Sequence, residues 1–223
     1  MGQTRLIGLT GSIATGKSVV ARILQAVFDA VVIDADAVVH ELLQHDADLR
    51  AAIVHVFGPD VLRSDGAIDR ERLGHIVFRN AAARRRLERL VHPRVIAITG
   101  RRIHAFLQAG AWLVVGMAPL MFETGTHTRY PLVVVTHCSM STQLHRLMMR
   151  DRIPESEARM RIAAQWSSER KARLADVVID TDGTLEETFG QVVALVHALR
   201  PDHPALSQCA HRFDRMRRLI TET

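Results

Sequence analysis

Residues 11–18 of this chain read G-S-I-A-T-G-K-S and match the phosphate-binding loop pattern G-x-x-x-x-G-K-S. An apolar run at 5–10 precedes the loop and a helix-forming stretch follows it, which is the context that the pattern requires. The two glycines let backbone N–H groups approach a phosphate without a Cβ in the way. We expect Lys17 to reach the β- and γ-phosphate oxygens and the Ser18 hydroxyl to hold Mg²⁺. The flanks disfavour a chance match, so the loop predicts binding of a nucleoside triphosphate.

Two carboxylates, Asp34 and Asp36, follow the next apolar run at 31–33. The carboxyl ends of strands in an open α/β sheet form the edge where ligands bind. There Asp34 is the better candidate for a general base that takes the proton from an attacking hydroxyl. Asp36 directly precedes a helical pattern, which favours a structural interpretation as the N-cap.

Two other groups allow either a chemical or a structural interpretation. His92 stands before Pro93, and this pair predicts that one helix ends there and another begins at the proline. A lone histidine at such a junction is more often structural. Glu123 follows a third apolar run and either orients a substrate or caps a turn.

Arg146 and Arg150 are four residues apart in a helical pattern, so they share one face of the predicted helix. Two guanidinium groups on one face suit the clamping of a transferring phosphoryl group. The spacing therefore predicts an arginine-bearing lid.

The bulk composition favours one α/β domain. The chain has 223 residues, of which 48% are hydrophobic, and a formal net charge of +5 that suits polyanionic ligands. The longest apolar run, 111–122, is too short to span a bilayer, and we find no secretion signal. Cys138 and Cys209 are far apart without metal-like spacing. These features predict a cytoplasmic protein with reduced thiols and no membrane association.

Short Val/Ile/Leu-rich runs alternate with helical patterns, which predicts a three-layer α/β fold around a five-stranded parallel sheet. The expected strands are 5–10, 30–33, 111–118, 132–136 and 177–180. A helical stretch at 46–110 is too long for a simple crossover and is predicted to be an acceptor-binding insertion. Residues 142–174 form the predicted lid region within a kinase domain at 1–200. The basic tail at 201–223 could dock on the core, contact an anionic partner or stay loose.

Several motifs occur in an order that closely resembles the dephospho-CoA kinase family over about residues 5–199. They are I-D-A-D at 33–36, H-P at 92–93, P-L-M-F-E at 119–123, Q-x-x-R-x-x-x-R at 143–150, and Arg161 with Gln165. The phosphate loop alone is shared by many NTPases, whereas these other elements in this order are far more diagnostic.

The resemblance implies a P-loop NTPase fold and ATP-dependent phosphorylation of the ribose 3′-hydroxyl of dephospho-CoA, with Mg²⁺. It implies Asp34 as the base, with Lys17 and Arg150 as further catalytic residues. We expect a monomer or weak homo-oligomer. The expected nucleotide-binding residues are Gly11, Ala14, Thr15, Gly16, Lys17, Ser18, Val19 and Arg146. The expected acceptor-binding residues are Asp34, His92, Glu123 and Arg161.

Three residues depart from the family pattern. Ser12 stands where a second glycine is usual and fits if its φ is negative. Met117 replaces a frequent acid, which leaves a metal-orienting carboxylate from the third strand in doubt. Thr181 replaces the usual Asn and weakens the inference of adenine contacts there.

Two other functions remain open from the sequence. One is a kinase for another small hydroxyl acceptor, such as a nucleoside or a sugar acid. The other is a nucleic-acid-binding NTPase, which the basic charge would suit. The chain has only one Tyr, two Trp and seven Phe, which offers little platform for base stacking, so no nucleic-acid partner is expected.

Overall fold

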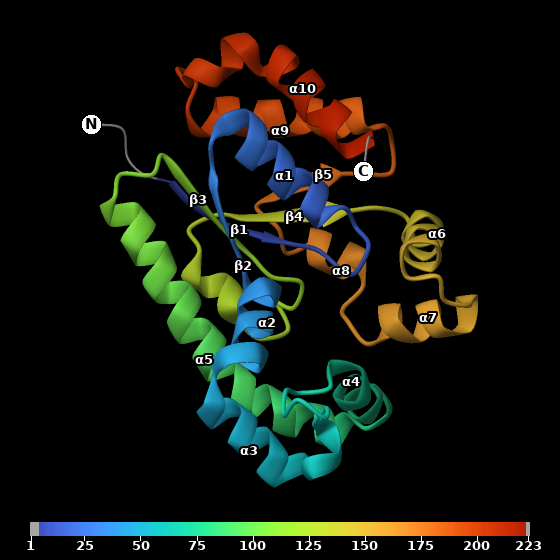
Figure 1. Cartoon of the computed structure of the whole chain (residues 1–223). Helices are drawn as coiled ribbons and strands as arrows, with labels where there is room; N and C mark the ends of the chain where they lie inside the picture. Colours follow the sequence, from blue (N-terminus) through green and yellow to red (C-terminus); the bar gives the residue numbers. More distant parts are fainter. Residues whose placement is uncertain (1–4, 222–223) are drawn as a thin grey trace. The chain divides into compact units, whose positions relative to one another are not determined.

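A five-stranded parallel sheet forms the centre of the larger part of the chain (Figure 1). The computed structural model describes residues 5–221. The strands lie in the order β2-β3-β1-β4-β5. They are β1 (Arg5–Thr10), β2 (Val31–Asp34), β3 (Leu113–Met117), β4 (Val133–His137) and β5 (Val177–Asp180). The first and last have the predicted bounds, and the other three differ from prediction by one or two residues at their ends.

Helices and loops cover both faces of this sheet, as a three-layer fold requires. α1 (Lys17–Phe28), α9 (Leu185–Leu199) and α10 (Cys209–Thr221) pack on one face. The other face is covered by α8 (Ser168–Ala172) and by the segment after β3, which includes η2 (Thr126–Arg129). Successive side chains of a strand point to opposite faces. Val134 accordingly packs in the first core, whereas Val133 and Val135 pack in the second.

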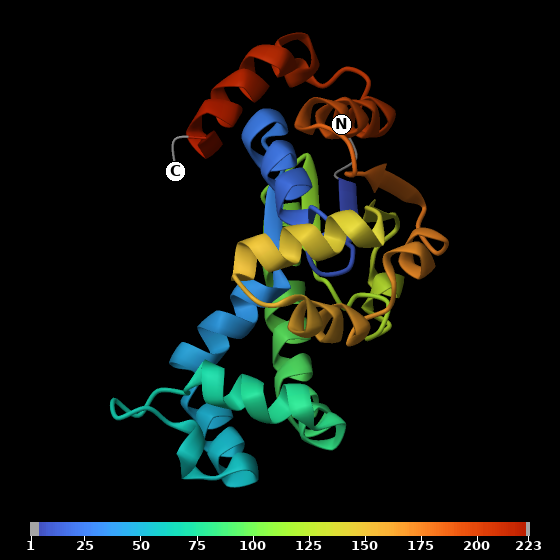
Figure 2. The same ribbon diagram turned by 90° about the vertical axis from the view of Figure 1, so that its right-hand side faces the viewer.

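Two helices follow β4 and make up the predicted lid region. α6 (Met140–Asp151) begins at Ser139, whose side chain accepts a hydrogen bond from the Thr142 N–H. α7 (Glu155–Ala163) begins directly after Pro154, which is its N-cap residue. Figure 2 shows α6 in yellow beside the blue loop that precedes α1, with α7 next to α6.

A second compact unit, Asp34–Ala105, is distinct from the unit that holds the sheet. It contains α2 (Ala35–His45), α3 (Ala47–Phe57), η1 (Pro59–Val61), α4 (Arg70–Arg79) and most of α5 (Ala81–Gln108). Asp46 and Asp69 cap α3 and α4 by accepting hydrogen bonds from backbone N–H groups. The stretch predicted to be helical is largely helical, apart from the turn at 62–69 with its bridge between Leu62 and Ile68, and its role in binding an acceptor stays a prediction.

The expected helix break at His92 and Pro93 is wrong. Pro93 lies inside the continuous helix α5. An interior proline removes one backbone hydrogen bond and costs about 3 kcal/mol of helix stability. Val91 and Val95 are buried in the core of the unit on either side of it, and the Arg94 guanidinium donates to the Leu90 carbonyl at 3.0 Å. This packing outweighs the local preference for a break.

The basic C-terminal segment docks on α1 rather than staying loose. Beyond α9 and η3 (Pro204–Gln208), Phe213 and Met216 of α10 are buried in the first core. Phe213 stacks on Phe189 with ring centroids 4.0 Å apart, and Arg212 pairs with Asp29 at 2.6 Å.

Among the described residues, none of the helices combines the length and apolar character needed to cross a bilayer.

A buried ion pair ties α8 to the segment after β3. Lys171 is fully buried, and its Nζ lies 2.9 Å from Glu123 Oε1 and donates to the Pro119 carbonyl at 2.6 Å. The same Glu123 oxygen accepts from the Trp166 N–H at 2.9 Å. Burial lowers the pKa of Lys171, and the Glu123 carboxylate opposes that shift. Glu123 therefore holds the segment with Trp166 and Lys171 against the segment after β3 and does more than cap a turn.

We expect Glu123→Gln to lower the free energy of unfolding by about 3 kcal/mol near neutral pH, because the Lys171 ammonium then lies buried without a counter-ion. The variant lowers the folded-state pKa of Lys171 further below its unfolded value. At a pH between the folded and unfolded pKa values of Lys171, the unfolded chain binds more protons than the folded chain. The free energy of unfolding of the variant therefore rises with pH, and its loss of stability relative to the parent becomes smaller. Chemical denaturation at about pH 7 and about pH 9.5 measures both effects.

The matched control is Glu186→Gln, which removes an exposed carboxylate paired with Arg217. It should cost less than about 1 kcal/mol. An equal loss of unfolding free energy in the two variants would contradict the claim that the buried pair contributes more to stability than the exposed pair.

Candidate active site

The loop at 11–18 leaves β1 and turns sharply into α1. Gly11 has φ 153° and Gly16 has φ 84°. A Cβ on Gly11 would lie 2.3 Å from the Thr136 hydroxyl, so this position has no room for a side chain. Ala14 has φ 60°, in the left-handed region that costs a non-glycine residue about 1–2 kcal/mol. The surrounding structure must therefore hold the loop in this shape.

Thr15 of the loop and Thr136 of β4 support the loop from behind. The Thr15 hydroxyl donates to the Ser12 carbonyl at 2.8 Å and lies 2.8 Å from the Thr136 hydroxyl. All of these groups are buried. Thr15 thus uses its side chain inside the protein, and only its backbone remains for a ligand.

The side chain of Lys17 arches back over the loop. Its Nζ donates to the Gly11 carbonyl at 2.8 Å and to the Ser12 carbonyl at 2.9 Å. These contacts hold the ammonium against the loop, where Lys17 also lines the adjacent pocket. A fixed positive charge is therefore present beside the expected phosphate site.

A pocket of about 680 Å³ opens beside the loop and collects most of the predicted nucleotide-binding residues. Those lining it are Ala14, Gly16, Lys17, Ser18, Val19 and Arg146, and the predicted catalytic residue Arg150 lines it as well. Gly11 and Thr15 are not among its lining residues. The sequence reasoning missed the lining residues His145, Met149, Gly183, Thr184, Leu185 and Thr188. Residues 183–185 come shortly after the end of β5 at Asp180, so their place near the carboxyl edge of the sheet was a usable signal.

The two lid arginines both line the pocket but differ in their present contacts. Arg146 donates to the Thr181 hydroxyl at 3.1 Å and to the Thr181 carbonyl at 2.5 Å, which fixes its guanidinium at the end of β5. Arg150 is exposed and pairs with Asp151 at 2.7 Å. That pair lowers the pKa of the Asp151 carboxyl, with Arg161 adding to the effect. An exposed pair of this kind is worth about 1 kcal/mol or less, so Arg150 can leave it at little cost.

The three departures from the family pattern each fit their surroundings. Ser12 has no positive φ, and its hydroxyl donates to the Trp166 carbonyl at 2.7 Å. The buried Thr181 hydroxyl lies 3.1 Å from both the Thr15 and His137 carbonyls. Met117 packs in the first core. Thr181 therefore links the phosphate loop, β5 and Arg146.

Asp34, and not Asp36, caps α2, which corrects the sequence expectation. Asp34 has extended backbone angles, and its Oδ1 accepts from the Asp36 N–H at 2.9 Å. The helix begins two residues earlier than the pattern suggested, so Asp36 lies within its first turn. Asp34 remains half-buried at the carboxyl end of β2.

The other predicted acceptor-binding residues are spread over both units. Glu123 holds Lys171 and Trp166, as described above. Arg161 pairs with Asp151 at 2.8 Å and with Glu157 at 2.6 Å within the lid region. His92 lies on α5 in the second unit. A contact of these groups with an acceptor stays a prediction.

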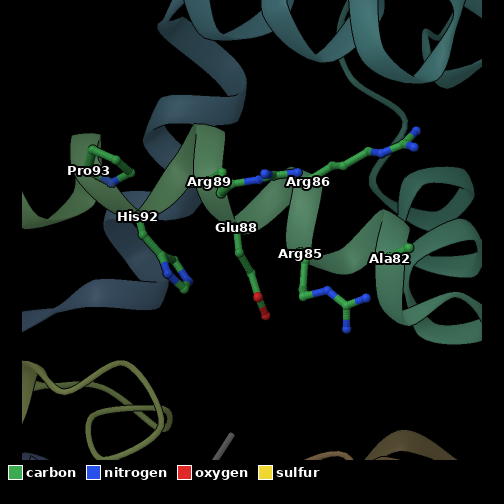
Figure 3. Close-up of a pocket in the computed structure, with 7 residues that line it drawn as sticks. All are labelled: Ala82, Arg85, Arg86, Glu88, Arg89, His92 and Pro93. Carbon is green, nitrogen blue, oxygen red and sulfur yellow. The ribbon is translucent and has the colours of Figure 1, made fainter.

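His92 belongs to a strongly basic face of α5 that the sequence reasoning did not single out. Figure 3 shows Arg85, Glu88 and His92 projecting to the same side of the helix. Their spacing of three and four residues places them on one face. With Arg86 and Arg89 they line a pocket of about 670 Å³. The run R-R-R-L-E-R at 84–89 was the signal for it.

Comparison with known proteins agrees with this geometry. A family model described as dephospho-CoA kinase matches residues 5–187. A dephospho-CoA kinase from Symbiobacterium thermophilum is 43% identical over 210 residues, covering 93% of this chain and 87% of that protein. A solved protein from Thermus thermophilus has a TM-score of 0.75 and 27% identity over 88% of this chain and 97% of its own. A dephospho-CoA kinase structure from Campylobacter jejuni has a TM-score of 0.60 and 26% identity, covering 88% and 98%.

The loop, the lysine over it and the two lid arginines thus occur in a chain whose match to one family covers most of its length. The chain belongs to the dephospho-CoA kinase family.

Proposed function

We propose that ATP binds in the pocket beside the phosphate loop and transfers its γ-phosphoryl group to the ribose 3′-hydroxyl of dephospho-CoA, the final step of coenzyme A synthesis. The observation that carries this proposal is the convergence of Lys17, Arg146 and Arg150 on one pocket. In-line transfer develops charge on the transferring oxygens, and fixed cations stabilise it.

Mg²⁺ fits the donors that this pocket offers. Among the described residues, no group of three or more His, Cys, Asp or Glu side chains could hold a metal. Mg²⁺ commonly binds through few protein ligands, several waters and substrate phosphates. The Ser18 hydroxyl lines the pocket and would hold the ion together with the phosphates of ATP. When bound, Mg²⁺ neutralises charge on the β- and γ-phosphates.

The acceptor carries a pyrophosphate, and the basic face of α5 has matching chemistry. Arg85, Arg86 and Arg89 line the same pocket as His92. Guanidinium groups recognise phosphate oxygens through paired hydrogen bonds. We therefore assign the acceptor's pyrophosphate to this face, with His92 as a further contact.

Asp34 is the proposed base for the ribose hydroxyl. Its Oδ1 accepts from the Asp36 N–H at 2.9 Å, and Oδ2 is the oxygen that we propose takes the proton. The N-cap role and the base role are compatible, because each uses a different oxygen. Glu123 and Arg161 are the other proposed acceptor-binding residues, and their ion pairs with Lys171 and with Asp151 would hold the two side chains in position.

Purified protein with ATP, Mg²⁺ and dephospho-CoA tests the proposal, with coenzyme A detected by mass. We expect saturable formation of the 3′-phosphorylated product, and much slower transfer to adenosine, pantetheine or gluconate. Preferred transfer to one of those acceptors would favour the other small-acceptor kinase. ATPase activity stimulated by DNA or RNA would favour the nucleic-acid-binding NTPase. The predicted monomer or weak homo-oligomer, and the predicted cytoplasmic location, need separate measurements.

Asp34→Asn should lower kcat by about 10²–10⁴, the usual contribution of a positioned base. ATP affinity should stay the same, because asparagine keeps an oxygen that can cap α2. Steady-state kinetics and nucleotide titration measure the two quantities. Asp36→Asn, at the second residue of α2, serves as the control and should retain near-normal kcat. A loss below tenfold for Asp34→Asn would make Asp34 a cap only.

Arg150→Ala should lower kcat far more than it weakens ATP binding, because a clamp on the transferring group acts on charge that develops only during transfer. Arg150→Lys should restore little, since an ammonium lacks the planar fork. Arg217→Ala removes an arginine of similar exposure that pairs with Glu186 on the docked C-terminal segment. It should leave kcat unchanged. Equal losses for Arg150→Ala and Arg217→Ala, or full activity in Arg150→Lys, would refute the clamp.

A further inference from the structure

We infer that Gln143 and Gln165 are positioning residues that set the shape of the phosphate loop from the lid region. They hold the two polar groups of a single loop residue, Ile13. The inference goes beyond the proposed function and rests on it only for the identity of the nucleotide.

The two glutamines reach Ile13 from different elements. Gln165, just after α7, accepts from the Ile13 N–H through Oε1 at 2.8 Å. Gln143 of α6 donates from Nε2 to the Ile13 carbonyl at 2.6 Å. Gln143 is only 1% exposed, so the carbonyl that it satisfies is shielded from competing water. A buried polar group left without a partner is costly, so both contacts constrain the loop.

The peptide bond converts these contacts into control of a phosphate-binding donor. The Ile13 carbonyl and the Ala14 N–H belong to one planar trans unit and point in opposite directions. Fixing the carbonyl toward Gln143 therefore fixes the Ala14 N–H on the other side. Ala14 lines the nucleotide pocket, and backbone N–H groups of such a loop are its phosphate donors.

The conformation of Ala14 explains why the loop needs this support. Its φ of 60° is unfavourable for a residue with a Cβ and persists only where neighbouring contacts impose it. Ile13 directly precedes Ala14, so the glutamines act at the residue where the strained turn begins. Without them, the peptide unit between the two residues is free to rotate toward a relaxed conformation.

Each glutamine is itself held in place. Trp166, next to Gln165, accepts from the Ser12 hydroxyl through its carbonyl and donates its N–H to Glu123. Gln143 precedes Arg146 by three residues and Arg150 by seven, so the three share one face of α6. A shift of α6 that moves the arginines therefore also moves the partner of the Ile13 carbonyl. The loop and the lid arginines are coupled through one helix.

Calorimetric titration with ADP tests the inference on Gln143→Leu, Gln165→Leu and the double variant. Leucine removes the hydrogen bonds at similar volume. We expect each single variant to bind ADP about tenfold more weakly, the effect of losing one such contact. The double variant should lose less than the product of the two, because both glutamines act on Ile13. KM for dephospho-CoA should stay the same, while KM for ATP rises.

Gln191→Leu is the matched control. Gln191 of α9 brackets a backbone residue in the same manner, accepting from the Asp180 N–H at 2.8 Å and donating to its carbonyl at 2.7 Å, but it does not contact the phosphate loop. It should lower the melting temperature with ADP affinity within about twofold of the parent. If Gln143→Leu does not fold, the partly exposed Gln165 decides the question alone.

ADP affinity within twofold of the parent in the Leu variants, or a loss no larger than that of Gln191→Leu, would overturn the inference. A parent protein that binds ADP but fails to phosphorylate dephospho-CoA would refute the proposed function instead. In that case the ADP titrations still decide whether the glutamines position the loop.

Discussion

The left-handed turn at Ala14 is the constraint on which the site depends. A phosphate loop presents its N–H groups inward only in such a shape, and this shape is unfavourable for the residues that adopt it. The protein holds it from behind through Thr15 and Thr136, and from the lid side through Ile13 and Ser12. Lys17 adds two hydrogen bonds, which its Nζ donates to the carbonyls of Gly11 and Ser12. The parallel sheet supplies Thr136 because β4 ends at the same edge as β1, and the lid region supplies Gln143, Gln165 and Trp166.

The lid region has two roles in this arrangement. It carries Arg146 and Arg150 to the nucleotide pocket, and it holds the loop that receives the phosphates. The buried pair of Lys171 and Glu123 anchors the end of that region to the segment after β3. Thr181 makes the corresponding link on the other side, where it fixes Arg146 at the end of β5. Thr181, one of the three residues that depart from the family pattern, thus contacts both Arg146 and the phosphate loop.

Local patterns in the sequence predicted the loop, the sheet and the lid arginines, because each depends on neighbours in the chain. The sequence did not reveal contacts between distant segments, such as Lys171 with Glu123 or Gln143 with Ile13. Pro93 was misjudged because burial on both sides of it outweighs its helix-breaking preference. Asp36 was predicted to be the N-cap of α2, whereas Asp34 is. The error arose because two acidic residues two positions apart both fit the pattern of a helix N-terminus. The basic face of α5 was visible as an arginine run, but only the structure shows which of its members line one pocket with His92.

Transfer by Lys17→Ala, compared with the parent protein under saturating ATP and dephospho-CoA, tests the central claim most directly. The ammonium at the mouth of the loop is the fixed positive charge proposed for the β- and γ-phosphates, and backbone N–H groups cannot replace it. The account predicts that formation of coenzyme A falls by about 10³ or more, while the protein stays folded. Turnover close to that of the parent would remove the phosphate loop from the reaction and contradict the account.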